Sequence, residues 1–191
     1  MLDTSLDWFR VILKREQGTP LPQASLPSGY SIVTFQSGDE EAWGEIEASV
    51  LEFADKDAAT EYFANNYLPY KDELARRTMF IQAHDGEKVA TFTAWWNYTG
   101  VRRHPFVHWV AVKPPFQGQG LGKAIIAAGV KHMIDIEGDR LMYIPTSTWA
   151  HKAIRLYRWA GFEVERHEPA PGGFENQTAQ ALQVLKERML I

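Results

Sequence analysis

Three glycines alternate with other residues in the segment Gln117-Gly118-Gln119-Gly120-Leu121-Gly122-Lys123. An apolar stretch typical of a strand precedes this segment, and apolar residues at helical spacing follow it. The backbone N–H groups of a glycine-rich turn at a helix N-terminus are unshielded, and such groups bind anions, phosphate above all. The segment therefore predicts a phosphate-binding loop. A glycine-rich turn without a ligand is the alternative interpretation.

Two common nucleotide-binding loops do not fit this spacing. A P-loop would need glycine at position 117 and serine or threonine at position 124, where the chain has Gln117 and Ala124. A dinucleotide-binding fingerprint beginning at Gly118 would need glycine at position 123, where Lys123 stands. The spacing therefore excludes both of these nucleotide-binding patterns.

Two segments together point to a known family. Gln117–Gly122 matches the pattern (Gln/Arg)-x-x-Gly-x-(Gly/Ala), and Val110-Ala111-Val112 precedes it as a strand. Ala153-Ile154-Arg155-Leu156-Tyr157, followed by Gly161-Phe162, forms a second motif. In both motifs and in their separation the chain resembles the GNAT superfamily of acyl-coenzyme A-dependent N-acetyltransferases, over roughly residues 29–166. The resemblance implies an α/β fold with a central, mostly antiparallel sheet flanked by helices.

The resemblance also implies a role for individual residues. The backbone of Val110 and Val112 would pair with the pantetheine arm, and the Val110 amide would polarise the acyl carbonyl. Lys123 or Lys113 would reach a phosphate, or both would be ordinary solvated lysines. Acetyl-CoA would be the co-substrate, with no metal ion. Backbone amides would hold the coenzyme diphosphate along the loop, at Gln117, Gly118, Gln119, Gly120, Leu121, Gly122 and Lys123.

The chain departs from the family pattern in two places. Many members carry asparagine three residues before the alanine of the second motif, where this chain has Ala150, and Thr148 or Ser147 would have to replace that contact. The tail after Arg166 has helical spacing, so the family's usual last strand is not evident.

Acyl transfer to an amine needs a proton acceptor and a donor for the thiolate. The resemblance assigns the donor to Tyr157, whose pKa of ~10 lies above that of a thiol at ~8.5, so a hydrogen bond to the thiolate is favoured over full proton transfer. His108 alternates with Val110 and Val112 on the expected strand, and its ordinary pKa of ~6.5 suits a proton relay. A core tyrosine, a core histidine, and a water-linked glutamate or aspartate are the alternatives.

Metal and thiol chemistry are not expected. His104 and His108 form an H-x₃-H pair, but on a strand they would lie about 13 Å apart, too far to share an ion. The chain has no cysteine, which excludes a cysteine nucleophile and thiolate metal sites. Transfer should therefore be direct, within a ternary complex.

Composition sets the broad class. The chain has 191 residues, 45% apolar and 23% charged, with a formal net charge of −4. These values indicate a globular protein without the excess of positive charge that is typical of binding to nucleic acid or to an anionic membrane. The lack of cysteine fits the reducing environment of the cytoplasm. We expect an N-terminal arm over residues 1–28, helix or strand, and a single acyl-CoA N-acyltransferase domain over residues 29–191. The arm would cover a core edge or cross to a partner, in a monomer or a homodimer.

Hydrophobic periodicity predicts the element order β-α-α-β-β-β-α-β-α-β for the domain. Pro69 should break the second helical stretch. Strands are expected at 29–35, 79–83, 89–98, 106–112, 141–144 and 162–166, and helices from about 39, over 56–77, 121–136 and 149–160, and in the tail at 175–190.

The function predicted is transfer of an acetyl group from acetyl-CoA to the primary amine of a small molecule or peptide. Residues 39–77 carry eleven acidic residues against four basic ones, which would attract a cationic amine or simply solvate helix faces. A non-catalytic acyl-CoA-binding sensor on the same fold is the alternative. Aromatic residues that would line an acceptor pocket, or fill the core, are Trp43, Tyr67, Tyr70, Trp95, Trp96, Tyr98 and Trp149.

Overall fold

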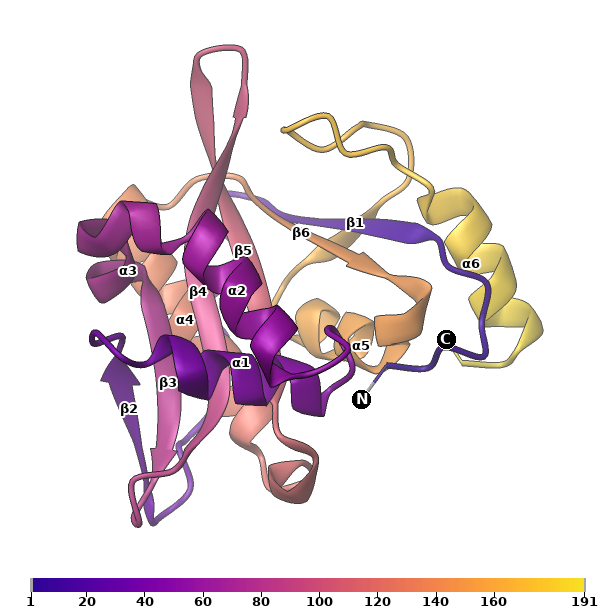
Figure 1. The fold of residues 1–191 in the computed structure, drawn as a ribbon. Helices are drawn as coiled ribbons and strands as arrows, with labels where there is room; N and C mark the ends of the chain where they lie inside the picture. Colours follow the sequence, from indigo (N-terminus) through magenta and orange to yellow (C-terminus); the bar gives the residue numbers. More distant parts are fainter. Residues whose placement is uncertain (1, 191) are drawn as a thin grey trace. The chain divides into compact units, whose positions relative to one another are not determined.

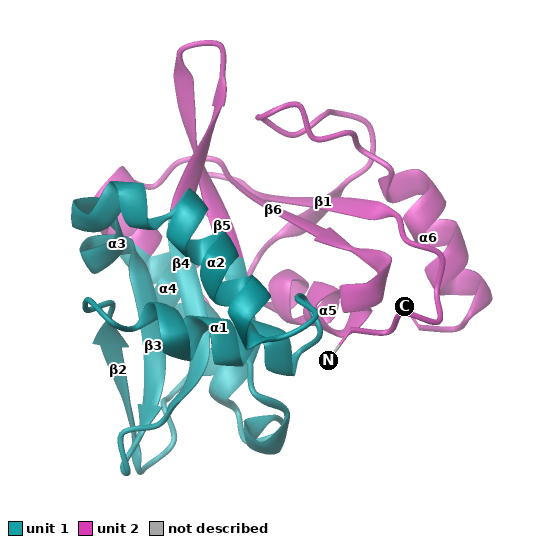
Figure 2. Ribbon diagram, viewed as in Figure 1, with its two compact units in different colours: residues 1, 23–94, 109–132 teal, residues 2–22, 95–108, 133–191 magenta. Residues whose placement is uncertain are grey.

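The computed structural model describes residues 2–190, which form two compact units (Figure 2). Unit 1 comprises residues 23–94 and 109–132. Unit 2 comprises residues 2–22, 95–108 and those from 133 onward. The long strands β4 (Lys88–Thr99) and β5 (Arg102–Val112) and the helix α4 (Leu121–Glu137) each contribute residues to both units.

Unit 1 combines antiparallel strands with helices on both faces. The strand β2 (Tyr30–Thr34) pairs with β3 (Thr78–Ala83), and β3 pairs with the first half of β4. The helices α1 (Glu40–Ser49) and α2 (Lys56–Asn66) pass in front of β3 and β4, and α4 lies behind them (Figure 1).

Local sequence explains the breaks in the helical part of unit 1. The Asp55 carboxylate caps α2 by accepting a 2.8 Å hydrogen bond from the Ala58 amide. The helix stops before Pro69, which lies in the 3-10 turn η1 (Leu68–Tyr70), and α3 (Lys71–Arg77) follows. The break expected at Pro69 is therefore confirmed.

In unit 2, part of the N-terminal arm forms a strand, which was one of the two expected alternatives. The strand β1 (Arg10–Arg15) pairs antiparallel with β6 (Met142–Ser147) on one side and β7 (Glu163–Glu165) on the other. Its Val11, Ile12 and Leu13 are fully buried.

The rest of unit 2 surrounds these strands. The strand β5 pairs in parallel with β6 through Phe106 and Tyr143. The helix α5 (His151–Trp159) follows the 3-10 turn η3 (Thr148–Ala150), and α6 (Thr178–Glu187) is the last helix of the described residues. The helical tail expected after residue 175 is confirmed by α6.

The seven strands follow the order β2-β3-β4-β5-β6-β1-β7, with β5 and β6 parallel and the other described pairs antiparallel. The mixed α/β class with a mostly antiparallel sheet is thus confirmed. The element order expected for the domain holds from β2 to β7, with the second helical stretch divided at Pro69 into α2 and α3. Within residues 2–190, no helix combines the length and apolar character needed to cross a membrane.

Candidate functional site

The glycine loop has the backbone shape that only glycine adopts without strain. The 3-10 turn η2 (Pro114–Phe116) ends β5, and α4 begins at Leu121. Gly118 and Gly120 have φ angles of +76° and +89°, in the left-handed region. A Cβ atom on Gly118 would meet no atom within 4 Å, so open space lies beside this backbone.

Several amides of the loop are available to a ligand. Among the described residues, the N–H groups of Gly118, Gln119 and Gly120 donate no hydrogen bond to the protein. The amides of Leu121 and Gly122 begin a helix of 17 residues, where the first turn has no intrahelical acceptor. These consecutive donors can bind an anion such as a diphosphate.

The Gln117 amide differs from its neighbours, because it donates a 3.2 Å hydrogen bond to the Pro114 carbonyl. Its side chain also donates to the Val112 carbonyl at 2.8 Å. The donors open to a ligand therefore begin at Gly118, and the Val112 carbonyl already accepts one hydrogen bond.

Other residues of unit 1 hold the loop in place. The Tyr30 hydroxyl donates to Gln119 Oε1 at 3.1 Å, and Gln119 Nε2 donates to the Pro115 carbonyl at 3.3 Å. The loop is thus supported from β2 and from its own turn, which keeps the free amides in one arrangement before a ligand arrives.

The two lysines near the loop differ in their surroundings. The Lys113 ammonium forms ion pairs with Glu87 at 2.8 Å and with Glu45 at 3.3 Å, and its side chain is largely buried. Lys123 is exposed on the first turn of α4. Lys123 is therefore the better placed of the two to meet a phosphate.

The end of β5 has an irregular backbone. Trp109 has a φ of +50°, a conformation that costs a non-glycine residue about 1–2 kcal/mol. It lies between His108 and Val110, so it interrupts the two-residue alternation from which a common face for these residues was predicted. Val110 and Val112 are half-buried.

The two proposed proton-handling residues belong to unit 2. Tyr157 on α5 is buried, and its ring packs edge-on to Phe162 at 6.5 Å. His108 packs edge-on to Phe106 at 5.9 Å. Burial lowers the pKa of His108 to about 4, so this imidazole is neutral near pH 7.

The hydroxyl of Thr148, one of the two expected replacements for the missing asparagine, is engaged within the protein. Its buried hydroxyl accepts a 3.1 Å hydrogen bond from the Phe9 amide and donates one of 2.6 Å to the Asp7 carbonyl. Both contacts fasten the segment before β1.

His104 and His108 belong to no larger group of potential metal ligands among the described residues. No group of three histidine, aspartate or glutamate side chains between residues 2 and 190 is arranged to hold an ion. His104 instead packs edge-on to Tyr143 at 5.9 Å, and burial together with the charges of Arg102 and Arg140 lowers the pKa of His104.

An aromatic cluster in unit 1 contains a carboxyl group that sequence reasoning did not single out. Glu47 is fully buried on α1, one turn after Trp43. A signal was present, because Trp43, Ile46, Glu47 and Val50 occupy one helical stripe, and Glu47 is its only charged member. The rings that gather about Trp43 are Phe53, Tyr62, Phe63, Tyr67 and Trp109.

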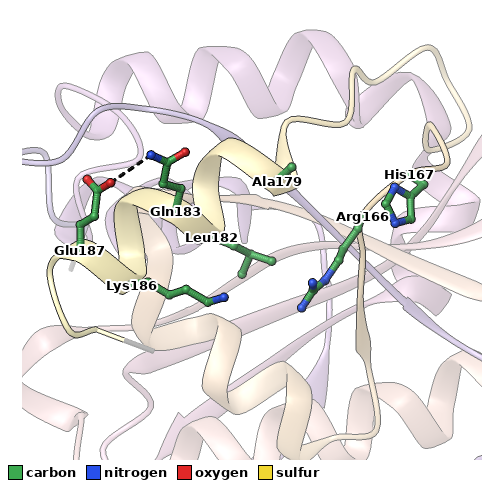
Figure 3. Close-up of a pocket in the computed structure, with 7 residues that line it drawn as sticks. All are labelled: Arg166, His167, Ala179, Leu182, Gln183, Lys186 and Glu187. Atoms are coloured by element: carbon green, nitrogen blue, oxygen red, sulfur yellow. Dashed lines mark hydrogen bonds between the residues drawn. The ribbon is translucent and has the colours of Figure 1, made fainter.

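A hollow of about 430 Å³ lies in unit 2 beside α6 (Figure 3). Figure 3 shows Arg166 and Lys186 extending toward the same space, with Leu182 between them. Gln183 and Glu187 join by a 3.0 Å hydrogen bond on its rim. Arg166 and Lys186 are exposed, so this hollow is an open surface feature and not an enclosed site.

The chain is similar in sequence to known acetyltransferases. The sequence model of the acetyltransferase (GNAT) family matches residues 40–162. A mycothiol acetyltransferase of Salinispora arenicola is 32% identical over 160 residues, 78% of this chain and 50% of that protein. One from Thermomonospora curvata is 30% identical over 163 residues, 80% of this chain and 52% of that protein. The chain spans about half the length of these curated relatives.

Solved structures share the fold. A GCN5-related N-acetyltransferase from Sphaerobacter thermophilus aligns with a TM-score of 0.61 at 21% identity, over 84% of this chain and 49% of that chain. An aminoglycoside N-acetyltransferase in complex with CoA aligns with a TM-score of 0.56 at 19% identity, over 78% of this chain and 97% of that chain.

Proposed function

Because the chain belongs to the GNAT acetyltransferase family, we propose that it transfers an acetyl group from acetyl-CoA directly to a primary amine in a ternary complex. The observation that carries this proposal is the row of unbonded amides at Gly118, Gln119 and Gly120. In the proposal these amides, with those of Leu121 and Gly122, bind the diphosphate of the coenzyme.

The thioester is proposed to lie along the end of β5. The backbone of Val110 and Val112 pairs with the pantetheine arm, and the Val110 amide polarises the acetyl carbonyl as charge develops on its oxygen. The hydrogen bond from Gln117 to the Val112 carbonyl supports a fixed orientation of this strand end before the coenzyme binds.

In the proposed transfer, the lone pair of the neutral amine forms the new C–N bond, the C–S bond breaks, and coenzyme A leaves as a thiolate that Tyr157 stabilises through a hydrogen bond. His108, through water, takes the proton that the amine loses. A base with a pKa of about 4 accepts little from a free alkylammonium of pKa ~10, so His108 acts after attack, when the nitrogen has become far more acidic.

The acceptor class is proposed from the relatives. Two are named mycothiol acetyltransferase and a third is an aminoglycoside N-acetyltransferase. We propose by analogy that this chain acts on the amine of a small molecule.

Two measurements test the proposed function together. Calorimetry with acetyl-CoA should give saturable binding, and a thiol-release assay over a panel of small amines should give amine-dependent turnover. Binding without turnover on any amine would favour a non-catalytic sensor. Absence of binding at millimolar acetyl-CoA would overturn both the enzyme and the sensor.

A further inference from the structure

Two polar atoms on one face of α1 are buried without a partner. Within the described chain, Oε1 of Glu47 and Nε1 of Trp43 have no hydrogen-bond partner. The two residues are four positions apart, so their side chains share one face of the helix. Leaving a buried polar group unpaired costs free energy of folding, and such groups in native proteins need an explanation.

Aromatic rings from three segments surround this face. The Trp43 ring lies 5.5 Å from Trp109 and 5.8 Å from Phe53. The Tyr62 ring lies 5.4 Å from Trp109 and 5.2 Å from Phe53. Phe53, Tyr62 and Trp109 are half-buried, so they form the boundary between Trp43 and the solvent.

Glu47 belongs to the same neighbourhood. Burial, followed by the nearby charges of Tyr62 and Glu47, raises the pKa of Tyr67, a ring of this cluster. Burial and the charge of Glu52 raise the pKa of Glu47 itself well above its ordinary value. An unpaired carboxyl next to aromatic faces is therefore costly as an anion when the site is empty, and an adjacent cation would stabilise it.

Electron-rich ring faces and a carboxylate attract the same kind of ligand. Aromatic cages bind ammonium ions through cation–π interactions, and a carboxylate accepts their hydrogen bonds. The fold itself supplies no cation here, because within the described residues no lysine or arginine forms an ion pair with Glu47. The strained backbone of Trp109 is a further sign of function, since such strain gathers at ligand sites.

We propose that Glu47, with the rings of Trp43, Phe53, Tyr62 and Trp109, binds the ammonium group of the acceptor, and that the acceptor is a cationic primary amine on an apolar stem. This inference rests on the proposed function. The ammonium donates to Glu47, which takes up one of its protons before attack so that the neutral amine has a free lone pair, and the stem lies against the rings. Because Glu47 is fully buried in the amine-free protein, the amine reaches it only when one of the half-buried rings of Phe53, Tyr62 and Trp109 moves aside.

A binding measurement tests this separately from turnover. Intrinsic tryptophan fluorescence is followed during titration with phenethylamine in the presence of CoA, with 2-phenylethanol as the uncharged match. We expect saturable binding of phenethylamine and at least tenfold weaker binding of 2-phenylethanol. Equal affinity for the two compounds, or no saturable change with either, would overturn the proposal.

Matched variants locate the site. Glu47→Gln keeps the shape of the side chain and removes its charge, and we expect it to weaken phenethylamine binding at least tenfold while calorimetric affinity for CoA stays within twofold. Glu61→Gln removes an exposed carboxylate from the neighbouring helix, and we expect amine binding within twofold of wild type. Equal losses in both variants, or none in Glu47→Gln, would contradict the assignment. Specific amine binding without thiol release would instead contradict the proposed function.

Discussion

The indole N–H of Trp109 donates a 2.7 Å hydrogen bond to the hydroxyl oxygen of Tyr67. Trp109 lies near the end of β5 in a left-handed conformation, and Tyr67 is the buried residue that follows α2. The bond therefore ties the irregular end of the strand to the helical part of unit 1. It offsets part of the cost of the strained backbone.

Removing this hydrogen bond should destabilise the protein. Tyr67→Phe deletes the acceptor and leaves the Trp109 indole N–H without it, so we expect a loss of about 1–2 kcal/mol in the free energy of unfolding, measured by urea denaturation. The control Tyr98→Phe removes an exposed hydroxyl and should stay within about 0.5 kcal/mol of wild type. Equal effects of the two substitutions would show that the bond contributes little.

Substitution in the glycine loop should weaken coenzyme binding specifically. Gly118→Ala strains the backbone at φ +76° and places a methyl group in the space beside the free amides, so we expect at least tenfold weaker CoA binding by calorimetry. Gly138→Ala is the matched control, because Gly138 follows the other end of α4 at φ +80° with equally open surroundings. If both variants lowered CoA affinity alike, the loss would reflect general destabilisation.

Tyr157→Phe should slow the chemical step more than it affects substrate binding. Loss of a hydrogen bond to the departing thiolate predicts a ten- to hundredfold lower kcat, about 1.4–2.7 kcal/mol, with little change in KM for acetyl-CoA. Tyr143→Phe, another buried tyrosine in unit 2, should keep kcat within twofold. An unchanged kcat in Tyr157→Phe would contradict the proposal that Tyr157 donates a hydrogen bond to the departing thiolate.

Burial of His108 predicts a pH dependence of stability. The unfolded chain binds a proton to this histidine below about pH 6.5, whereas the folded protein does so only near its pKa of about 4. The contribution of neutral His108 to the free energy of unfolding is therefore fully present above about pH 6.5. It decreases as the pH drops toward 4, by up to about 3 kcal/mol.

Denaturation at pH 7 and pH 5 measures this effect. His108→Gln should lose less stability between the two values than wild type does, because the titrating group is gone. His84→Gln, in the exposed turn between β3 and β4, should behave as wild type. A wild-type slope retained in His108→Gln would mean that other groups account for it.

The hydroxyl of Thr148 should matter for the N-terminal segment. Thr148→Val keeps the shape but removes both hydrogen bonds to residues 7 and 9, and we expect a loss of about 1–3 kcal/mol in unfolding free energy. Thr148→Ser retains the hydroxyl and should recover most of this difference. Equal stability of the valine and serine variants would contradict a role for these bonds.

Features that depend on chain neighbours were predictable from the sequence. Pro69 predicts the end of α2 because proline removes a helical donor and clashes with the preceding turn. The glycines at 118 and 120 predict a tight turn between β5 and α4, and both adopt the left-handed conformation.

Features that depend on distant residues were not predictable. The apolar run at residues 11–13 suits a helix or a strand, and only its pairing with β6 and β7 decides between them. The hydroxyl of Thr148 forms hydrogen bonds with the backbone of Phe9 and Asp7, which precede it by 139 and 141 positions, and no local sequence pattern reveals these contacts. Glu47 shows an intermediate case, since its place in an apolar stripe was visible while its aromatic surroundings were not.

The most direct test of coenzyme binding observes the loop amides themselves. The protein is labelled with ¹⁵N-glycine and titrated with CoA while amide resonances are followed by NMR. We predict the largest saturable shifts at Gly118, Gly120 and Gly122, with Gly86 and Gly173 nearly unmoved. Saturation with CoA that shifts glycines elsewhere and leaves these three in place would contradict the account.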